Sequence, residues 1–256
     1  MKVKGIIFDF GFTLFYFDNP SVERYYECFK QGLLKSIEIL KEKQVWSEEL
    51  SNESFVKKFA KQRQSYFIES IKTKNEFPTT LIFQRVLESL KGENIINDIE
   101  QIDEKIYNQL AETYHSCEED EWEPFEKTRE TLEILTKRKI KIALISNHPH
   151  HQTIENMLKK HGLLKFFDFI LTSAKFGKRK PDPNIFFYTI EKMGLKDHSN
   201  SVLMCGDEYA DIIGAQRANI QFILLERKYR FPFEKEINIS NLRKINNISE
   251  ILNYIG

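Results

Sequence analysis

The sequence predicts an α/β fold in which a Rossmann-like parallel sheet core is interrupted after its first strand by an all-helical insertion. Short apolar runs rich in β-branched residues alternate with helical patterns before residue 18 and after residue 121. Between these points, apolar residues recur at helical spacing. We therefore expect an α/β core formed by residues 1–17 and 122–256 and a helical cap formed by residues 18–121.

The core is expected to contain five buried strands, because five short runs are almost entirely apolar. These runs are VKGIIFDF (3–10), KIALISN (141–147), FDFILTS (167–173), SVLMCGD (201–207) and QFILLER (221–227). Helical patterns cover residues 126–138, 151–161, 184–193 and 210–218. This alternation favours a parallel sheet with helices on both of its faces.

The insertion is expected to be helical throughout. Its first helix is indicated by Val22, Tyr25, Phe29, Leu33, Ile37 and Leu40, and its last helix by Ile99, Ile102, Ile106, Leu110 and Tyr114. Phe55, Phe59 and Tyr66 mark a second helix, and Pro78 opens a third that carries Leu81 to Leu90.

Composition and charge exclude some classes of partner. The 38 basic residues balance the 38 acidic residues, so the chain as a whole is not attracted to nucleic acid or to an anionic membrane. No apolar stretch approaches the ~18 to 20 residues of a membrane-spanning helix, and the start MKVKGIIFDF lacks a signal-peptide cleavage site. We expect a cytoplasmic protein, a monomer or small homo-oligomer, with neither nucleic acid nor a membrane as partner.

The cysteines support the same location. Cys28, Cys117 and Cys205 are too few and too widely separated to predict a disulfide framework or a cysteine metal site. Such a pattern suits a reducing cytoplasm.

Polar side chains stand where the predicted strands end. Asp9 ends the first run, Ser146 and Asn147 end the second, and Asp207 ends a later one, with Lys180 on a loop between them. Any one of these residues is commonly a turn former, a helix cap or a solvated side chain. Ligands of parallel sheets bind at the carboxyl ends of the strands, so together the residues predict a site for a divalent cation and a phosphate.

The motifs that contain these residues resemble the haloacid dehalogenase-like hydrolase superfamily, in its phosphatase type with a helical cap. FDFGFTL is similar to the first family motif, KIALISN to the second, GKRKPDPNIF to the third and VLMCGDEYADIIGAQRANI to the fourth. The residues that match in this way are Asp9, Thr13, Ser146, Lys180, Asp207 and Asp211. The cap resembles the family's helical insertion only in its position and type.

This resemblance implies a phosphohydrolase for a small phosphorylated metabolite. Asp9 would attack phosphorus and form an aspartyl-phosphate, which divides one difficult step into two easier ones. Ser146, Asn147 and Lys180 would bind the phosphoryl oxygens.

The resemblance also implies a cofactor, Mg²⁺. Its ligands would be Asp9, Asp207 and the backbone carbonyl of Gly11, with Asp211 in support. All of these are oxygen donors, which Mg²⁺ prefers.

The first motif departs from the family at Gly11, where phosphatases usually carry a second aspartate as general acid and base. Phe12 also replaces the usual glycine. Loss of a positioned proton donor typically costs ~10²- to 10⁴-fold in rate. Three residues are possible substitutes, namely His148, Asp18 and Glu208.

Other functions in the superfamily stay open. Haloacid dehalogenases lack the second aspartate and need no metal, although Gly206 and Asp207 argue against that chemistry. Phosphonoacetaldehyde hydrolases carry a small residue at the position of Gly11 but need a lysine in the cap. A catalytically impaired protein that binds a phosphorylated metabolite or acts as a scaffold is a further alternative.

Three further groups of residues are interpreted as structural. His148, His150 and His151 are expected to begin an exposed helix with Pro149 near its first position, and not to converge on a transition metal. The aromatic run Phe15, Tyr16 and Phe17 favours hinge or core packing over a substrate pocket. Arg63 and Arg85 are interpreted as solvated residues of the cap helices.

Overall fold

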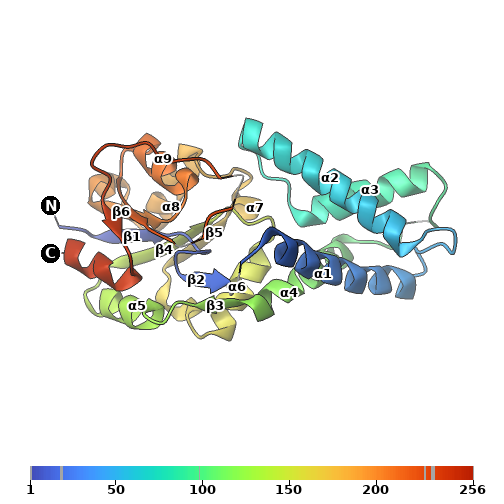
Figure 1. Cartoon of the computed structure of the whole chain (residues 1–256), viewed down its shortest axis with the longest axis horizontal. Helices are drawn as coiled ribbons and strands as arrows, with labels where there is room; N and C mark the ends of the chain where they lie inside the picture. Colours follow the sequence, from blue (N-terminus) through green and yellow to red (C-terminus); the bar gives the residue numbers. More distant parts are fainter. Residues whose placement is uncertain (1, 18–19, 98, 228, 232–233, 256) are drawn as a thin grey trace. The chain divides into compact units, whose positions relative to one another are not determined.

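The computed structural model describes residues 2–17, 20–97, 99–227, 229–231 and 234–255. The chain folds into two compact units. The sheet unit comprises Met1–Pro20 and Glu121–Gly256, and the helical unit comprises Ser21–Asp120. Figure 1 shows their elements along the chain.

The sheet unit is built on six parallel strands in the order β5-β4-β1-β6-β7-β8. The strands are β1 (Gly5–Phe8), β4 (Lys141–Ser146), β5 (Phe169–Thr172), β6 (Val202–Gly206), β7 (Gln221–Leu225) and β8 (Lys244–Ile245). All five predicted strands are present, and the predicted α/β class with a Rossmann-like parallel sheet is confirmed. The strand that the sequence did not indicate, β8, has only two residues.

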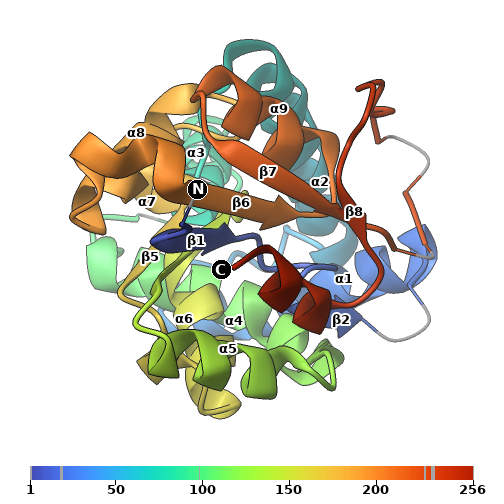
Figure 2. The same cartoon turned by 90° about the vertical axis from the view of Figure 1, so that its left-hand side faces the viewer.

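Helices cover both faces of this sheet. They are α5 (Thr128–Lys137), α6 (His151–Lys160), α8 (Pro183–Lys192) and α9 (Tyr209–Arg217). Figure 2 shows α8 and α9 on one side of the sheet and α5 and α6 on the other. Because successive side chains of a strand point to opposite faces, Ile6 packs in the core that contains Leu132 of α5, whereas Ile7 packs with Ile185 of α8.

A second, two-stranded sheet was not predicted. It pairs β2 (Phe15–Phe17) with β3 (Trp122–Pro124) in antiparallel register, with Phe17 opposite Trp122. Phe15 and Phe17 are buried in the core, so the structure agrees with packing for this aromatic run. The remaining short elements are η1 (Leu164–Phe166), α7 (Ser173–Phe176), η2 (Lys196–Ser201) and η3 (Ile248–Tyr254).

The helical unit contains α1 (Val22–Glu42), α2 (Asn52–Thr73), α3 (Thr79–Gly92) and α4 (Glu104–Glu121). Ser21 and Ser51 cap α1 and α2 by accepting backbone N–H bonds. The expectation of helix at Ile99 and Ile102 is wrong, because the side chain of Asp103 accepts from the Ile106 N–H and α4 begins only after it.

A line of close contacts joins α1 to α4. Ser36 Oγ donates to the backbone carbonyl of Leu110 at 3.0 Å. A Cβ added to Gly32 would lie 2.0 Å from the carbonyl oxygen of Tyr114, so only glycine allows this approach. One turn before Gly32, Cys28 forms a disulfide with Cys117, with Cα atoms 5.6 Å apart.

The disulfide corrects the interpretation of the cysteines. No disulfide framework was expected, but Cys28 and Cys117 form one bridge, while Cys205 is a buried free thiol. Helical spacing on α1 and α4 brings the two thiols together over a sequence separation of 89 residues, which spacing along the chain does not reveal. The cysteine pattern therefore no longer supports a reducing compartment, and the cytoplasmic location stays a prediction.

The two arginines singled out in the helical unit have different surroundings. Arg63 is not simply solvated, because its guanidinium lies over the ring of Phe29 at 4.5 Å. Arg85 is exposed and donates to Glu88 at 2.9 Å, as a solvated helix residue would.

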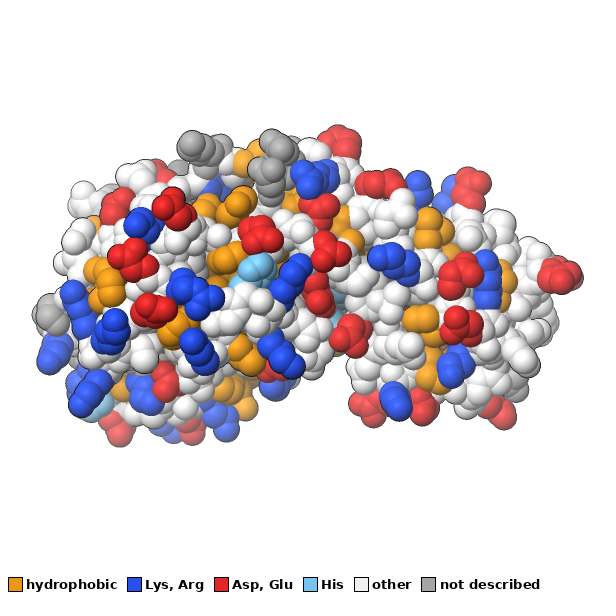
Figure 3. Space-filling view, turned by 90° about the horizontal axis from the view of Figure 1, so that it is seen from below, with side chains coloured by type: hydrophobic (Ala, Val, Ile, Leu, Met, Phe, Trp, Pro, Cys, Tyr) orange, Lys and Arg blue, Asp and Glu red, His pale blue; other side chains and the backbone are white. Residues whose placement is uncertain are grey.

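The surface carries charges of both signs. On the face in Figure 3, lysine and arginine side chains are interspersed with carboxylates, and hydrophobic side chains form small areas between them. None of the helices in the described ranges combines the length and the apolar character that crossing a membrane requires.

The disulfide should stabilise the helical unit. Because the bridge closes a loop of 89 residues, we expect reduction to lower the free energy of unfolding by about 2–4 kcal/mol. Thermal and urea denaturation with and without dithiothreitol would measure the loss. The double variant Cys28→Ala/Cys117→Ala is the control and should not respond to dithiothreitol. An equal response of wild type and control would contradict the prediction.

Candidate active site

The predicted site residues of the core lie at the carboxyl ends of neighbouring strands. Asp9 follows β1, Ser146 is the last residue of β4, and Asp207 follows β6. β1 pairs with both β4 and β6, and the Asp9 N–H donates to the Cys205 carbonyl at 3.0 Å. The parallel register therefore gathers residues that are far apart in the sequence at one edge of the sheet.

Lys180 is the central charge of this site. Its Nζ lies 2.5 Å from Asp9 Oδ1, 2.6 Å from Asp211 Oδ1 and 3.0 Å from the backbone carbonyl oxygen of Ile145. Burial alone would lower the pKa of Lys180, but the carboxylates of Asp211, Asp9 and Glu208 outweigh it and raise the pKa. The side chain is therefore a fully buried ammonium ion at neutral pH.

Asn147 holds Lys180 in place. Its Nδ2 donates to the Lys180 carbonyl at 3.0 Å, and its Oδ1 accepts from the Lys180 N–H at 2.8 Å. The peptide bond between Lys180 and Pro181 is cis. The amide of Asn147 thus has a positioning role that the sequence did not indicate, and its contact with a phosphate stays a prediction.

Asp207 is held from two sides. Thr13 Oγ1 donates to Asp207 Oδ1 at 2.7 Å, and Arg227 Nε lies 3.1 Å from Asp207 Oδ2. Burial raises the pKa of Asp207 well above its ordinary value, while Arg227 opposes the rise and nearby carboxylates add to it. Arg227 is therefore the contact that favours the ionised form of Asp207.

Asp211 links Lys180 to the start of α9. Its Oδ2 lies 3.2 Å from the Asp207 backbone N and 3.1 Å from the Glu208 backbone N, and both N–H groups donate to it. Glu208 is the N-cap residue of α9 and forms a capping box with Asp211. Asp211 is thus a structural support of the site, and its indirect role toward a metal stays a prediction.

The donor set fits a hard divalent cation. Carboxylate oxygens of Asp9, Asp207 and Asp211 all lie within 4.8 Å of one another, and all three residues are buried. Burial outweighs the attraction of Lys180 and raises the pKa of Asp9 to about 6, with Asp211 adding to the rise. Clustered carboxylates are the ligands that Mg²⁺ prefers. The contribution of the Gly11 carbonyl stays a prediction.

Trp122 occupies the space beside Gly11. A Cβ added to Gly11 would lie 3.0 Å from Trp122 Cη2 and 3.2 Å from Trp122 Cζ3. The indole is fixed by edge contact with Phe12 and by stacking on Phe17. A side chain at this position would therefore require the Trp122 indole to give way, which is a physical reason for glycine in the first motif.

Phe12 has an unusual backbone conformation. Its φ of 55° lies in the left-handed region, which glycine adopts without strain and other residues avoid. The ring packs edge-on against Trp122 and Phe231, and the Arg227 guanidinium lies over it at 4.8 Å. Aromatic and cation–π contacts therefore offset the strain where the family usually has glycine.

The three possible substitutes for the missing aspartate have different surroundings. His148 is half-buried, and its Nδ1 lies 2.7 Å from the His150 carbonyl oxygen. Burial and the nearby Asp211 raise the pKa of Glu208 to about 7, but this side chain takes part in the capping box of α9. Asp18 lies outside the described residues. The role of each of the three as general acid or base therefore stays a prediction.

The rings of the histidine-rich segment have different hydrogen-bond partners. His150 Nδ1 lies 2.8 Å from Thr153 Oγ1, and His151 Nδ1 lies 3.1 Å from Thr172 Oγ1. The helix begins at His151 with His150 as N-cap, so Pro149 precedes the helix. The expectation of an exposed helix start is wrong for His150, which is buried because its ring packs against the first turn.

Three residues near the site were missed by the sequence interpretation. Arg227 contacts Asp207, Glu234 forms an ion pair with Arg227, and Trp122 fills the space beside Gly11. One signal was present for Arg227: it follows a buried strand in QFILLER, as the other site residues follow theirs. No local pattern singles out Glu234 or Trp122.

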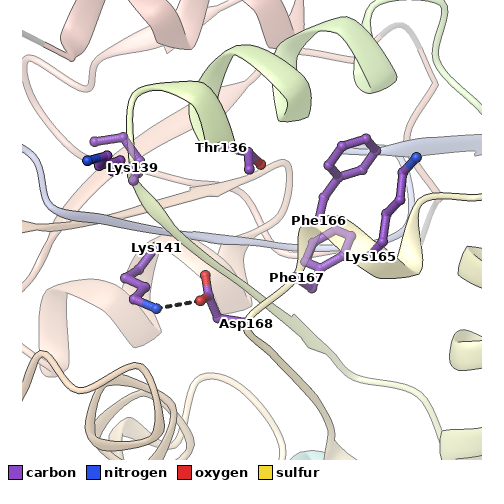
Figure 4. A pocket seen from close by; sticks show the side chains of 8 residues that line it. Thr136, Lys139, Lys141, Lys165, Phe166, Phe167 and Asp168 are labelled. Atoms are coloured by element: carbon purple, nitrogen blue, oxygen red, sulfur yellow. Dashed lines mark hydrogen bonds and ion pairs between the residues drawn. The ribbon is translucent and has the colours of Figure 1, made fainter.

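A pocket lies at the other end of β4. It has a volume of about 260 Å³ and is lined by Thr136, Lys139, Ile140, Lys141, Lys165, Phe166, Phe167 and Asp168. Figure 4 shows the ion pair between Lys141 and Asp168 in its wall. Lys141 begins β4 and Ser146 ends it, so this pocket is separate from the carboxylate site.

The comparison with protein families identifies the class. The chain matches the sequence model of the haloacid dehalogenase-like hydrolase family over residues 47–225, which is more than half of its length. The chain belongs to this family, as its motifs predicted. The match includes Ser146, Lys180, Asp207 and Asp211 but begins after Asp9, so the part assigned to Asp9 depends on the motif and the geometry described above.

Individual relatives agree with this class. The chain is 35% identical over 127 residues to haloacid dehalogenase-like hydrolase domain-containing protein 3 of Danio rerio, covering 49% of this chain and 50% of the relative. It is 28% identical over 163 residues to pyrophosphatase PpaX of Oceanobacillus iheyensis, covering 60% of this chain and 75% of the relative. The chain thus spans about half the length of the first relative and three quarters of the second.

A solved structure confirms the fold. The 2-haloacid dehalogenase of Pseudomonas syringae pv. Tomato superposes with a TM-score of 0.67 at 20% identity, covering 98% of this chain and 97% of that chain. At this identity the likeness concerns the fold alone.

The Trp122 indole should make any side chain larger than glycine at position 11 destabilising. Since a Cβ at Gly11 would meet the indole at 3.0 Å, we expect Gly11→Ala to lower the free energy of unfolding by about 1–3 kcal/mol. Urea denaturation would measure the change. Gly92→Ala is a matched control, because a Cβ there meets nothing within 4 Å.

A double-mutant cycle would test the contact itself. The cost of Gly11→Ala should be smaller when Trp122→Phe is also present, since the smaller ring leaves room for the Cβ. An equal cost with and without Trp122→Phe would show that the indole does not set the requirement.

Proposed function

We propose that the protein is a Mg²⁺-dependent phosphohydrolase that acts on a small phosphorylated metabolite through an aspartyl-phosphate at Asp9. The observation that carries this proposal is the contact of buried Asp9 with the Lys180 ammonium, beside Asp207 and Asp211. A nucleophilic carboxylate, a phosphate-neutralising cation and a set of oxygen ligands therefore share one site. A pyrophosphatase among the relatives supports phosphorus chemistry.

In the first step, a carboxylate oxygen of Asp9 attacks phosphorus. An oxygen–phosphorus bond forms to Asp9, and the bond from phosphorus to the leaving-group oxygen breaks with its electron pair. The positive charge of Lys180 reduces the repulsion between the Asp9 carboxylate and the negatively charged phosphoryl group. Ser146 donates a hydrogen bond to a phosphoryl oxygen. A divalent cation bound at Asp9 and Asp207, with Asp211 in support, would supply further charge neutralisation.

In the second step, water attacks the phosphorus of the aspartyl-phosphate. The bond to Asp9 breaks, the carboxylate is restored and inorganic phosphate leaves. Both steps need proton transfer, to the leaving group in the first and from water in the second. The family's usual aspartate for these transfers is absent, and the Trp122 indole lies beside Gly11 instead. Substitution by His148 or Glu208 is part of the proposal.

We propose that the helical insertion, residues 18–121, acts as a cap. A helical insertion between the first strand and the rest of the sheet can close over a substrate and exclude water. The protein would be a monomer or small homo-oligomer, and its location would be the cytoplasm.

A metal-independent dehalogenase is the second candidate. Two observations favour it: Gly11 leaves no second carboxylate in the first motif, and Lys180 and Arg227 already contact the carboxylate cluster. One of the proteins that share this fold is itself a 2-haloacid dehalogenase. Asp9 would then attack carbon and displace halide. The phosphonoacetaldehyde hydrolase and scaffold alternatives have no such structural support.

Substrate screening would test the proposed function. We expect phosphorylated metabolites, including acyl phosphates, to be turned over in a Mg²⁺-dependent reaction that is lost in EDTA. Phosphonoacetaldehyde, whose phosphorus is bonded to carbon, is screened alongside them and should not be turned over. Asp9→Asn should abolish turnover, since an amide of the same size is not a nucleophile. Phosphate release is the measurement, and circular dichroism checks the fold of the variant. Activity retained by Asp9→Asn, or EDTA-resistant turnover of a haloacid, would exclude the phosphatase mechanism.

Gly11 predicts a preference among leaving groups. Without a positioned acid, acyl and aryl phosphates should be hydrolysed faster than alkyl phosphates, since their leaving groups need less protonation. The second step should also be slow, so rapid-quench kinetics should show a burst and a phosphoenzyme at Asp9. Brisk alkyl-phosphate turnover without a burst, lowered ~10²-fold or more by His148→Ala, would instead assign the proton transfers to His148.

A further inference from the structure

Arg227 brings a second buried cation to the carboxylate site. It follows β7, and its guanidinium lies between Asp207 and Glu234. The side chain is only 6% exposed. Glu234 is itself fixed, because its Oε1 accepts from the backbone N–H of Phe231 at 2.8 Å. The arginine therefore has one carboxylate partner within the candidate metal site and one outside it.

The contact with Asp207 is electrostatic. Arg227 Nε lies 3.1 Å from Asp207 Oδ2, but this buried N–H has no hydrogen-bond partner among the described residues. The opposite oxygen, Oδ1, accepts from Thr13. Since charge-assisted hydrogen bonds are the stronger contacts, the hydrogen bond of Arg227 Nη2 to Glu234 anchors the guanidinium more firmly than Asp207 does.

Phe12 provides a surface for the guanidinium. Its ring lies 4.8 Å from the Arg227 guanidinium carbon and contacts Trp122 and Phe231. The position has a left-handed backbone in which phenylalanine is strained. The Phe12 ring supplies a contact surface that glycine could not, and the guanidinium lies over it.

We propose that Arg227 is a built-in competitor of the divalent cation at Asp207. In the cation-free protein it neutralises Asp207. When a divalent cation binds, repulsion between the two positive groups drives the guanidinium from Asp207 along the Phe12 ring, and Glu234 keeps it paired. This proposal rests on the proposed function, because it assigns the same carboxylates to the cation.

Metal affinity measures this competition without any assay of turnover. Isothermal titration of the intact protein with Mg²⁺ or Mn²⁺ should show binding about 10- to 100-fold tighter in Arg227→Gln than in wild type, the equivalent of one charge-assisted contact. Arg227→Met should tighten cation binding to a similar extent, because the apolar methionine side chain keeps the packing over Phe12. Arg230→Gln is the control: it removes the same charge from an exposed position three residues away and should leave the affinity unchanged.

Glu234 allows a second, opposite test. Glu234→Gln should weaken cation binding by about 5-fold or more, because the displaced guanidinium loses its remaining partner. Glu234→Gln should have no effect on cation binding when Arg227→Gln is also present, because that variant has no guanidinium with which Glu234 could pair. Circular dichroism would establish that each variant is folded.

The outcomes separate this proposal from the proposed function. Affinity that stays within about twofold of wild type, or falls, in both neutral Arg227 variants would overturn the competitor role, even if turnover requires Mg²⁺. Tighter binding in those variants with no phosphatase activity in any protein would support the competitor role and remove the proposed function. If neither wild type nor variants bind a divalent cation, both are wrong.

Discussion

The ion contacts of Lys180 are the interaction on which the site depends. Three buried carboxylates with oxygens within 4.8 Å of one another repel strongly when no cation offsets them. The ammonium of Lys180 bridges two of them, Asp9 and Asp211, and a third contact joins it to the Ile145 carbonyl at the end of β4. The position of one nitrogen atom therefore connects the ends of β1 and β4 with the first turn of α9.

The carboxylates around this nitrogen are partly neutralised before any cofactor binds. Lys180 and Arg227 face Asp9, Asp207 and Asp211, and Thr13 adds a neutral hydrogen bond. A site assembled in this way keeps its geometry because opposite charges hold one another, but it attracts a divalent cation less than a bare carboxylate cluster would. Its cation affinity is thus a property of the whole set of charges and not of the ligands alone.

Most of the fold and the strand-end residues could be predicted from the sequence, because their signals are local. The runs that became β1, β4, β5, β6 and β7 are apolar over their length, and the polar residue after each strand stands out. What could not be predicted depends on distant pairs. Trp122 and Gly11 are neighbours only because β2 pairs with β3, and Asn147 reaches the Lys180 backbone across 33 residues.

The two short strands and the start of α4 were not predicted for related reasons. Strands β2 and β3 have three residues each, too few to show a periodic pattern. The start of α4 at Glu104 is set by Asp103, whereas the apolar spacing continues upstream through Ile102 and Ile99. Spacing alone cannot separate a capped helix start from a preceding apolar turn.

The bridge between Cys28 and Cys117 has a topological consequence. It joins the first and last helices of the helical unit, close in sequence to the two points where the chain passes to the sheet unit. The β2–β3 ladder pairs the chain again on the other side of those points, with Phe17 opposite Trp122. Residues 28–117 therefore form a covalent ring within the helical unit, and the β2–β3 ladder pairs the two chain segments that precede and follow it in the sequence. Cys28 and Cys117 thus stay joined to each other even when the chain between them is unfolded.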